Sequence, residues 1–273
     1  MSRLGLSLPS TAVLRARGGA VPPEAQALMA RMSVAPSALR ARSIATLVGS
    51  LKAAGLWAKL DLLYILAAHD AQAARLNWVG DHYTLTAVNS PSFVTDRGYA
   101  SGTSAYLATG YNPAVNGIHF TRNNAHMGVW DLTNRAAANI IPGGISANTS
   151  LQCAVMPRST GDLAWINVND QGTALGGVTR SDGLTLGSRL DAATRANYRD
   201  ATLLGTAPAA SIAVPSVPLD LLCWSINGGT SRIYWCTDRI AVFTMGAGLT
   251  SPEVAAFHGA LLAYLTAVGA VSA

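Results

Sequence analysis

The chain has 273 residues, of which half are hydrophobic and 12% are charged, and its formal net charge is +5. This length is ample for a large hydrophobic core, and the composition is neither that of a disordered protein nor that of a highly charged one. The longest uninterrupted apolar run, residues 62–68, is far shorter than the ~20 residues that a membrane span requires, so a transmembrane protein is excluded.

The positive charge is concentrated at the N-terminus. Residues 1–60 carry eight basic residues against Glu24, whereas residues 61–273 carry 11 arginines against 13 acidic residues. Nucleic-acid sites usually combine a denser basic cluster with several aromatic residues, and Trp57 is the only aromatic residue in this segment. The basic segment is therefore predicted to bind other proteins rather than nucleic acid.

Two helices are predicted near the N-terminus, after an extended arm over residues 1–20. Pro22 and Pro23 favour a helix start, and this helix extends to about residue 32. A second helix begins near Pro36, carries an apolar stripe and ends at Gly55. We predict that residues 1–56 form a docking and oligomerisation segment and that residues 57–273 form a separate jelly-roll domain.

Short apolar or alternating runs dominate the chain from residue 60 onward, with turn signals about every 8 to 15 residues. The predicted strands are residues 60–68, 83–88, 93–100, 104–109, 126–132, 151–156, 163–169, 184–190, 201–206, 219–226 and 232–243. Because no long helices separate them, we predict a mainly β fold, an antiparallel β-sandwich or jelly roll. A closing helix is predicted with Ser251 as its N-cap and Gly269 at its end.

The three cysteines, Cys153, Cys223 and Cys236, have no metal-ligand spacing, and their odd number argues against a secreted disulfide framework. If the turn after residue 226 centres between residues 229 and 230, Cys223 lies opposite Cys236 and Trp224 opposite Trp235. The spacing leaves open whether that cysteine pair is bonded. The N-terminus has no apolar segment of signal-peptide length, so export through the general secretory route is not expected.

The sequence lacks most of the residues that hydrolases need. Glu24 and Glu253 are the only glutamates, and both lie in predicted first turns of helices. A glycosidase needs two carboxylates beside the scissile bond, and no predicted strand carries such a pair. No motif for a serine nucleophile, a zinc site or a nucleotide is present. We therefore expect no enzyme activity, no cofactor and no metal site; the alternative is a polysaccharide-degrading hydrolase that uses a pair of distant aspartates.

One predicted strand places a tryptophan among amides. Alternation over residues 163–169 puts Trp165, Asn167 and Asn169 on one face and apolar residues on the other. A tryptophan ring can stack on a sugar while neighbouring amides bond to its hydroxyl groups. These three residues are therefore candidates for contact with a glycan.

A second strand repeats this arrangement. Alternation over residues 122–132 groups Arg122, Asn124, His126 and Trp130, which are further candidates for glycan contact. The alternative is that each tryptophan fills the sandwich core or a subunit interface, and the usual burial of tryptophan favours it.

Several stretches resemble a family of structural proteins from tailed bacteriophages, prophages and gene-transfer agents. They are GLWAKLD (55–61), LAAHDAQAA (66–74), LNW (76–78), AVNSP (87–91), TDRGY (95–99) and YLATGYNP (106–113). The C-terminal stretches RIAVF (239–243) and LTSPEVAA (249–256) are similar to the last strand and closing helix of concanavalin A-like jelly rolls. The resemblance covers roughly residues 36–270 and does not define functional residues.

The resemblance implies a structural component of a phage-like particle, located in the virion and assembled in the cytoplasm of the host bacterium. Tail fibre, head spike, capsid decoration and baseplate appendage all remain open. The expected partners are other virion proteins, bound through residues 1–56, host cell-surface polysaccharide and further copies of the chain, with no nucleic acid and no membrane. A free intracellular lectin is the alternative.

Overall fold

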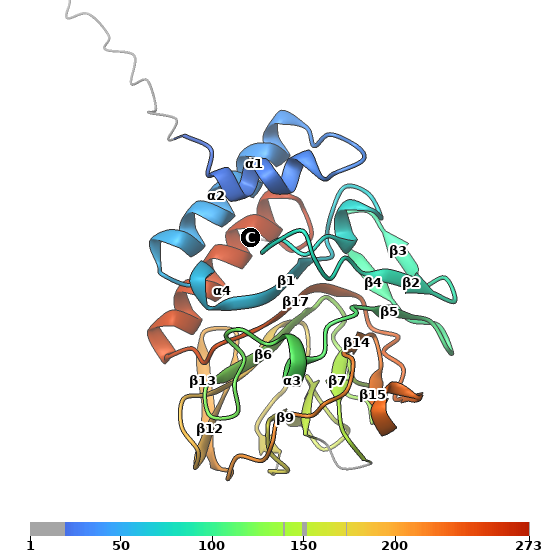
Figure 1. Cartoon of the computed structure of the whole chain (residues 1–273), viewed down its shortest axis with the longest axis vertical. Coiled ribbons are helices and arrows are strands. Elements are labelled where there is room, and N and C mark those ends of the chain that lie inside the picture. The colour runs from blue at the N-terminus through green and yellow to red at the C-terminus, as the bar shows by residue number, and fades with distance from the viewer. Residues whose placement is uncertain (1–19, 139, 149–151, 173, 273) are drawn as a thin grey trace, which may run out of the picture.

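Helices α1 (Pro23–Ala30), α2 (Ala38–Ala53) and α4 (Ser251–Ala267) lie together on one side of a two-sheet β-sandwich (Figure 1). The structure is a computed structural model that describes residues 20–138, 140–148, 152–172 and 174–272. All of the arm predicted for residues 1–20 except Ala20 lies outside the described residues.

The predicted helices are present. The helices are α1 (Pro23–Ala30), α2 (Ala38–Ala53), α3 (Pro113–Asn116) and α4 (Ser251–Ala267), with 3-10 turns at Trp57–Lys59, Ala73–Arg75 and Asn227–Gly229. The N-cap of α4 is Thr250 rather than the predicted Ser251, because Thr250 and Glu253 form a reciprocal capping box. Within the described residues, no helix combines the length and apolarity needed to cross a membrane.

The first sheet has eight strands among the described residues. Its order is β13 (Thr202–Pro208), β12 (Thr194–Arg199), β11 (Gly183–Arg189), β6 (Ala125–Asp131), β17 (Ile240–Gly246), β4 (Gly98–Ala100) and β3 (Ser92–Val94), and β1 (Leu60–Ile65) also pairs with β17. Every pairing in this sheet is antiparallel. This sheet lies directly beneath the helices.

The second sheet has nine strands among the described residues. Its order is β10 (Leu175–Gly176), β9 (Leu163–Val168), β8 (Cys153–Met156), β7 (Gly143–Ile145), β14 (Asp220–Leu221), β5 (Tyr106–Ala108) and β2 (Thr86–Val88), and β15 (Trp224–Ile226) joins it beside β16 (Ser231–Ile233). It is antiparallel apart from the parallel pair β15–β7. The predicted mainly β jelly-roll sandwich is confirmed.

Two hydrophobic layers hold the fold together, one on each face of the first sheet. In β1, Leu62 and Tyr64 face the layer between the sheets, whereas Leu63 and Ile65 face the helices. The central strands are therefore buried on both faces, which explains their nearly continuous apolar sequences. Helices α1, α2 and α4 contribute to the layer on the helix-facing side of this sheet, which we name the outer layer. A docking role for residues 1–56 stays a prediction.

The strand pairing near the cysteines differs from the predicted register. Trp224 pairs with Ile233 rather than with Trp235, so the predicted opposition of Cys223 and Cys236 is wrong. The cause is the local backbone, since a 3-10 turn at Asn227–Gly229 shifts the hairpin by two residues. All three cysteines are buried free thiols, and burial raises the pKa of Cys153 to about 12.

Candidate functional site

The amides of the predicted glycan-binding face on β9 are structural. Asn167 and Asn169 are enclosed, with 1% and 0% exposure. Asn167 donates to the carboxylate of Asp170 at 2.8 Å, and Asn169 donates to the carbonyl groups of Thr121 and Arg122 at 3.1 and 3.2 Å. The prediction that these two asparagines contact a glycan is wrong, because their amides bond to buried groups of the chain.

Asp170, which bonds to Asn167, is the centre of a buried charge network. Its two carboxylate oxygens form ion pairs with Arg189, at 2.9 Å, and with Arg195, and all three side chains are at most 1% exposed. Although burial opposes ionisation, Arg195 and several hydrogen bonds keep the pKa of Asp170 below its ordinary value. Asn167 of β9 and Arg195 of β12 thus belong to this network.

Helix α4 packs against the two members of the second predicted set that lie on β6, His126 and Trp130. His126 is fully buried, and its ring bonds to the Ala247 carbonyl at 2.5 Å and to the Thr244 hydroxyl at 3.0 Å. The prediction of glycan contact by His126 is wrong, because the ring has no exposed surface. Trp130 is 3% exposed and stacks on His258 of α4, with the ring centroids 5.3 Å apart.

The two exposed members of this set, Arg122 and Asn124, form hydrogen bonds that hold neighbouring loops in place. Asn124 accepts a hydrogen bond from the backbone amide of Gly248 at 2.8 Å. Arg122 donates to the backbone carbonyl of Ser211 at 2.7 Å. Arg122 and Asn124 therefore remain accessible but do not share a site with Trp130, which lies at the other end of β6.

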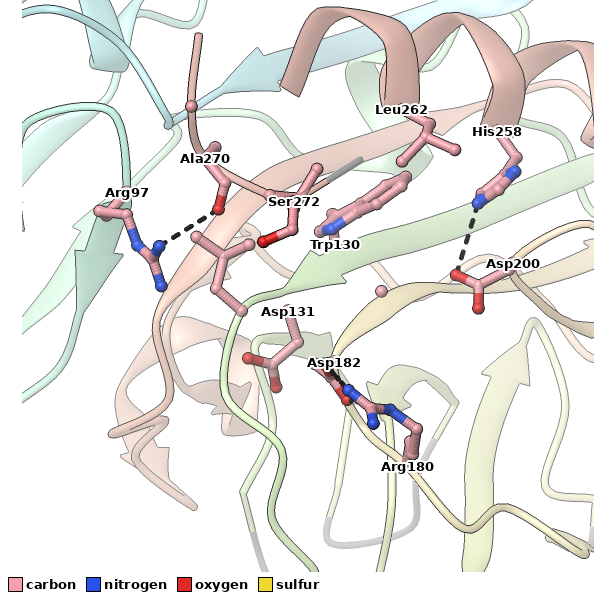
Figure 2. Close-up of a pocket in the computed structure, with 14 residues that line it drawn as sticks. Arg97, Trp130, Asp131, Arg180, Asp182, Asp200, His258, Leu262, Ala270 and Ser272 are labelled. Atoms are coloured by element: carbon pink, nitrogen blue, oxygen red, sulfur yellow. Dashed lines mark hydrogen bonds and ion pairs between the residues drawn. The ribbon is translucent and has the colours of Figure 1, made fainter. Parts of the chain in front are cut away.

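Trp165 and Trp130 belong to different sheets and line two different pockets. Trp165 lies in a cavity of about 480 Å³, which we name the aromatic cleft. Trp130 borders a cavity of about 600 Å³, which we name the polar pocket. The polar pocket also contains Arg97, Asp131, Arg180, Asp182, Asp200 and His258 (Figure 2).

The aromatic cleft is formed by neighbouring strands of the second sheet and the loops that follow them. Its walls include Ile141, Met156, Leu163, Trp165, Trp224 and Tyr234, with Ser159 and Thr160 beside them. Register places Trp165 opposite Met156 and Trp224 opposite Gly144. A Cβ atom at Gly144 would lie 3.0 Å from Trp224 Cδ1, so glycine allows the indole to lie against β7. None of the described residues that line the cleft is charged.

The aromatic rings are held in position by an unusual backbone conformation. Tyr234 has a φ of 56°, in the left-handed region, which costs a bulky residue about 1 to 2 kcal/mol. Its carbonyl accepts a hydrogen bond from the Ile141 amide at 3.2 Å, and its ring stacks on Trp224 at 5.4 Å with a 20° interplanar angle. Such conformations often occur at functional sites, where the surrounding structure maintains them.

The aromatic cleft also holds a polar atom without a partner. The indole Nε1 of Trp224 is buried and has no hydrogen-bond acceptor in the described residues. Tyrosine and tryptophan side chains usually have a hydrogen-bond partner when they are buried, so the indole of Trp224 would gain one from an acceptor that reaches it through the cleft. The cleft can therefore offer stacking surfaces and a hydrogen-bond donor to a small uncharged molecule.

The residues predicted from alternation include Trp165 but not Trp224 and Tyr234, which line the same cleft. Trp224 begins a strand of three residues, which is too short for a pattern, and Tyr234 follows β16 in a loop. No sequence signal predicted the left-handed conformation of Tyr234. Among the described residues, no group of three or more His, Cys, Asp or Glu side chains could hold a metal ion.

Comparison with known proteins finds structures of similar fold but no family. No family model and no curated protein matches the chain. The structure is similar to that of botulinum neurotoxin type C, with a TM-score of 0.51 and 9% sequence identity. The match covers 77% of this chain and 53% of that chain. Cell entry of that neurotoxin is described as dependent upon interaction with two ganglioside molecules. At this identity the similarity shows the shared fold alone.

Two further structures were found. Domain 4 of AbnA, a GH43 extracellular arabinanase from Geobacillus stearothermophilus in complex with arabinotriose, has a TM-score of 0.46 and 12% identity over 73% of this chain and 98% of that chain. The binding domain of Paraclostridial Mosquitocidal Protein 1 has a TM-score of 0.49 and 9% identity over 75% of this chain and 53% of that chain. The chain thus spans about half the length of the neurotoxin and mosquitocidal chains that it matches.

Proposed function

We propose that this chain is a carbohydrate-binding protein that holds a glycan in the aromatic cleft without cleaving it. The observation that carries the proposal is the presence, in one uncharged cleft, of half-buried aromatic rings and a buried indole N–H without an acceptor. The apolar face of a sugar stacks on aromatic rings, while its hydroxyl groups accept and donate hydrogen bonds. The fold that it shares with a neurotoxin that interacts with gangliosides is compatible with this role.

Within this proposal, Trp165 and Tyr234 provide the stacking surfaces and Trp224 donates a hydrogen bond. Because the cleft contains no charged side chain among its described lining, the bound part of the glycan is expected to be an uncharged sugar. Host cell-surface polysaccharide is the expected source of this sugar.

The experiment is a binding screen against an array of bacterial surface oligosaccharides. Trp165→Ala is expected to weaken binding at least about tenfold, since it removes a stacking surface, whereas Trp165→Phe retains part of the affinity. The matched control is Trp235→Ala, because Trp235 is also half-buried but lies outside the cleft. Equal binding by wild type and Trp165→Ala, or equal losses in both alanine variants, would contradict the assignment of the cleft.

We further propose that the protein is a homo-oligomeric structural component of a phage-like particle, assembled in the bacterial cytoplasm and anchored by its N-terminal segment. The sequence resemblance of residues 36–270 to phage structural proteins supports a location in the particle. The similar structures reported above do not bear on this location. The charge of the segment supports the anchor. Within the described residues, Arg31, Arg40, Lys52 and Lys59 form ion pairs inside the chain, whereas Arg42 does not. Among the described basic residues of the segment, Arg42 is therefore the one whose charge is not paired inside the chain, and the sequence adds three arginines in residues 1–19.

Incorporation into particles tests the anchor. Replacing Arg3, Arg15 and Arg17 by glutamine is expected to abolish co-sedimentation with particles while leaving glycan binding and the melting temperature unchanged. Replacing Arg122, an exposed arginine on the sandwich, by glutamine is the control. Unchanged incorporation of the triple variant would refute an electrostatic anchor, and a wild-type chain that never sediments with particles would favour a free lectin.

One observation favours the alternative of a polysaccharide-degrading hydrolase. Asp131, Asp182 and Asp200 line the polar pocket together, and glycoside hydrolysis uses paired carboxyl groups. Burial and the neighbouring Asp238 carboxylate raise the pKa of Asp131 well above its ordinary value, as a general acid requires. Incubation with bacterial surface polysaccharide distinguishes the two functions. Release of reducing ends that Asp131→Asn abolishes would establish the hydrolase, and no release would support binding alone.

A further inference from the structure

The polar pocket is a separate cavity with charges of opposite sign at its two ends. Figure 2 shows Arg97 at one end, Asp200 and His258 at the other, and Trp130 and Ser272 between them. Its residues come from strands of the first sheet and the loops beside them, from helix α4 and from the C-terminal residues 269–272. The aromatic cleft and the polar pocket have no lining residue in common.

The cationic end carries a charge without a counter-ion. The guanidinium of Arg97 donates to the carbonyl of Ala270 at 3.3 Å, and among the described residues it forms no ion pair with a carboxylate. Burial, and then the positive charge of Arg97, lower the pKa of the neighbouring Arg239. An exposed guanidinium with free N–H groups is a ready binding partner for a carboxylate.

The loop that carries Arg97 is fixed by contacts on either side. Asp96 forms an ion pair with Arg40 of α2 at 2.5 Å, and its backbone amide donates to the Ala68 carbonyl at 2.9 Å. At Gly98, with a φ of 90°, a Cβ atom would lie 2.0 Å from the carbonyl oxygen of Ile240. The turn between β3 and β4 therefore presents Arg97 at a defined place.

At the opposite end, the carboxylates of Asp182 and Asp200 differ in whether both of their oxygens already bond within the chain. Both oxygens of Asp182 bond to Arg180. In Asp200, Oδ1 accepts from the Leu184 amide at 2.9 Å and lies 3.5 Å from His258 Nε2, while the side chain is 45% exposed. Asp200 therefore keeps an exposed carboxylate oxygen that can accept hydrogen bonds from the hydroxyl groups of a ligand.

The lining between the two ends is partly apolar. Leu262 is 37% exposed, and Val271 and the edge of Trp130 lie in the same lining. A ligand that fits all three regions has an anionic group, an apolar face and hydroxyl donors at a distance from the anion. A sugar acid has this combination, whereas a simple anion or an aliphatic acid lacks part of it.

We infer that the polar pocket is a second saccharide site, independent of the aromatic cleft, and that it takes an anionic sugar whose carboxylate binds Arg97 and whose hydroxyl groups bind Asp200. The apolar face of the sugar ring rests on Leu262 and the edge of Trp130. Two sites of different charge preference allow one chain to hold a polysaccharide that contains both neutral and acidic sugars.

The test compares acidic saccharides with their neutral counterparts by isothermal titration calorimetry. The probes are trigalacturonic acid with its trimethyl ester, and 3′-sialyllactose with lactose. At least one acid is expected to bind at least about tenfold more tightly than its neutral counterpart, and this preference decreases as salt is added. Equal binding of acid and neutral forms, or no binding of either acid, would overturn the inference.

Variants locate the binding. Arg97→Gln is expected to weaken binding of the acid at least about tenfold, whereas Arg42→Gln, at an exposed arginine of α2 outside the pocket, leaves it unchanged. Trp165→Ala is expected to leave acid binding unchanged, so the two sites are tested separately. Loss of acid binding in Trp165→Ala with no loss in Arg97→Gln would place the acid in the aromatic cleft and overturn the inference.

Discussion

The side chain of Asp61 shows how one buried residue fixes a whole loop. Its carboxylate is 6% exposed and accepts hydrogen bonds from the amides of His119 and Phe120 at 2.9 Å and of Ile118 at 3.2 Å, and from the hydroxyl of Tyr111 at 2.9 Å. Asp61→Asn places an amide group against these donors, so we expect a loss of about 2 to 4 kcal/mol in the free energy of unfolding.

Urea denaturation measures this loss. Tyr111→Phe serves as the comparison, because it removes one of the bonds and leaves the carboxylate with its amide partners, and we expect it to cost about 1 kcal/mol. Equal losses for the two variants would show that the amide bonds of Asp61 contribute little.

Titration of His126 makes stability depend on pH. Burial lowers the pKa of this ring from 6.5 to about 4, so the unfolded chain binds a proton at a higher pH than the folded chain. The contribution of His126 is complete above pH 6.5 and is lost as the pH falls from about 6.5 to about 4, by about 3 kcal/mol in total.

Denaturation at pH 7.0, 5.5 and 4.5 tests this dependence. The carboxyl groups contribute their own acid dependence, so the comparison is with His126→Gln, which is expected to be less stable at pH 7 but to lose less stability between pH 7 and pH 4.5. Parallel pH profiles for the two proteins would show that the ring does not govern stability in this range.

At the level of elements, helix α4 carries a glycine where the fold does not need one. Gly259 is exposed in the middle of the helix, and a Cβ atom at this position would meet no heavy atom within 4 Å. Gly259→Ala is therefore expected to stabilise the protein by about 0.5 to 1 kcal/mol, since alanine reduces the freedom of the unfolded chain.

The matched variant is Gly187→Ala in β11. Here a Cβ atom would lie 2.4 Å from Ile166 Cγ2, across the space between the two sheets, so this substitution is expected to destabilise the protein. Thermal unfolding of both variants checks the pair, and a destabilised Gly259→Ala protein would contradict the assignment of an unneeded glycine.

Helices and long strands followed from local pattern, whereas strands β7, β10 and β12 did not. Alternation identified β6, β9 and β11 because their apolar residues face the layer between the sheets or the layer under the helices. Strand β7 is absent from the predicted strands because Gly143 and Gly144 resemble turn residues. In the sheet these glycines make room for Phe243 and Trp224. Bulky partners distant in sequence therefore determine this strand.

Strand β12 was missed for an electrostatic reason. Its inward residues include Arg195 and Asn197, which an alternation rule assigns to the surface. Both are fully buried, and Arg195 forms an ion pair with Asp170 while donating to Asn197 at 2.9 Å. The same partnership explains why the candidate site was only partly predictable: Asn167 looked like a ligand-binding amide because its partner Asp170 was not recognised as the centre of a buried network.

At the scale of the whole molecule, the helices bury one face of the first sheet. The outer layer joins Leu28 of α1, Ile44 and Leu47 of α2 and Phe257 of α4 with strands β1 and β17. All four side chains are at most 1% exposed. The described part of the N-terminal segment thus covers the sandwich, whichever surface it presents to a particle.

The structural role of α2 can be separated from its docking role by two substitutions on opposite faces. Ile44→Asp places a charge in the outer layer, so we expect a loss of more than about 3 kcal/mol and exposure of apolar surface that binds ANS. Leu39 is 75% exposed on the same helix, and Leu39→Asp is expected to leave the melting temperature unchanged. If Leu39→Asp prevents incorporation into particles while it retains stability and glycan binding, the exposed face of α2 is part of the anchor. If Ile44→Asp unfolds as wild type does, the helices are a detachable module and the layer beneath them contributes little to stability.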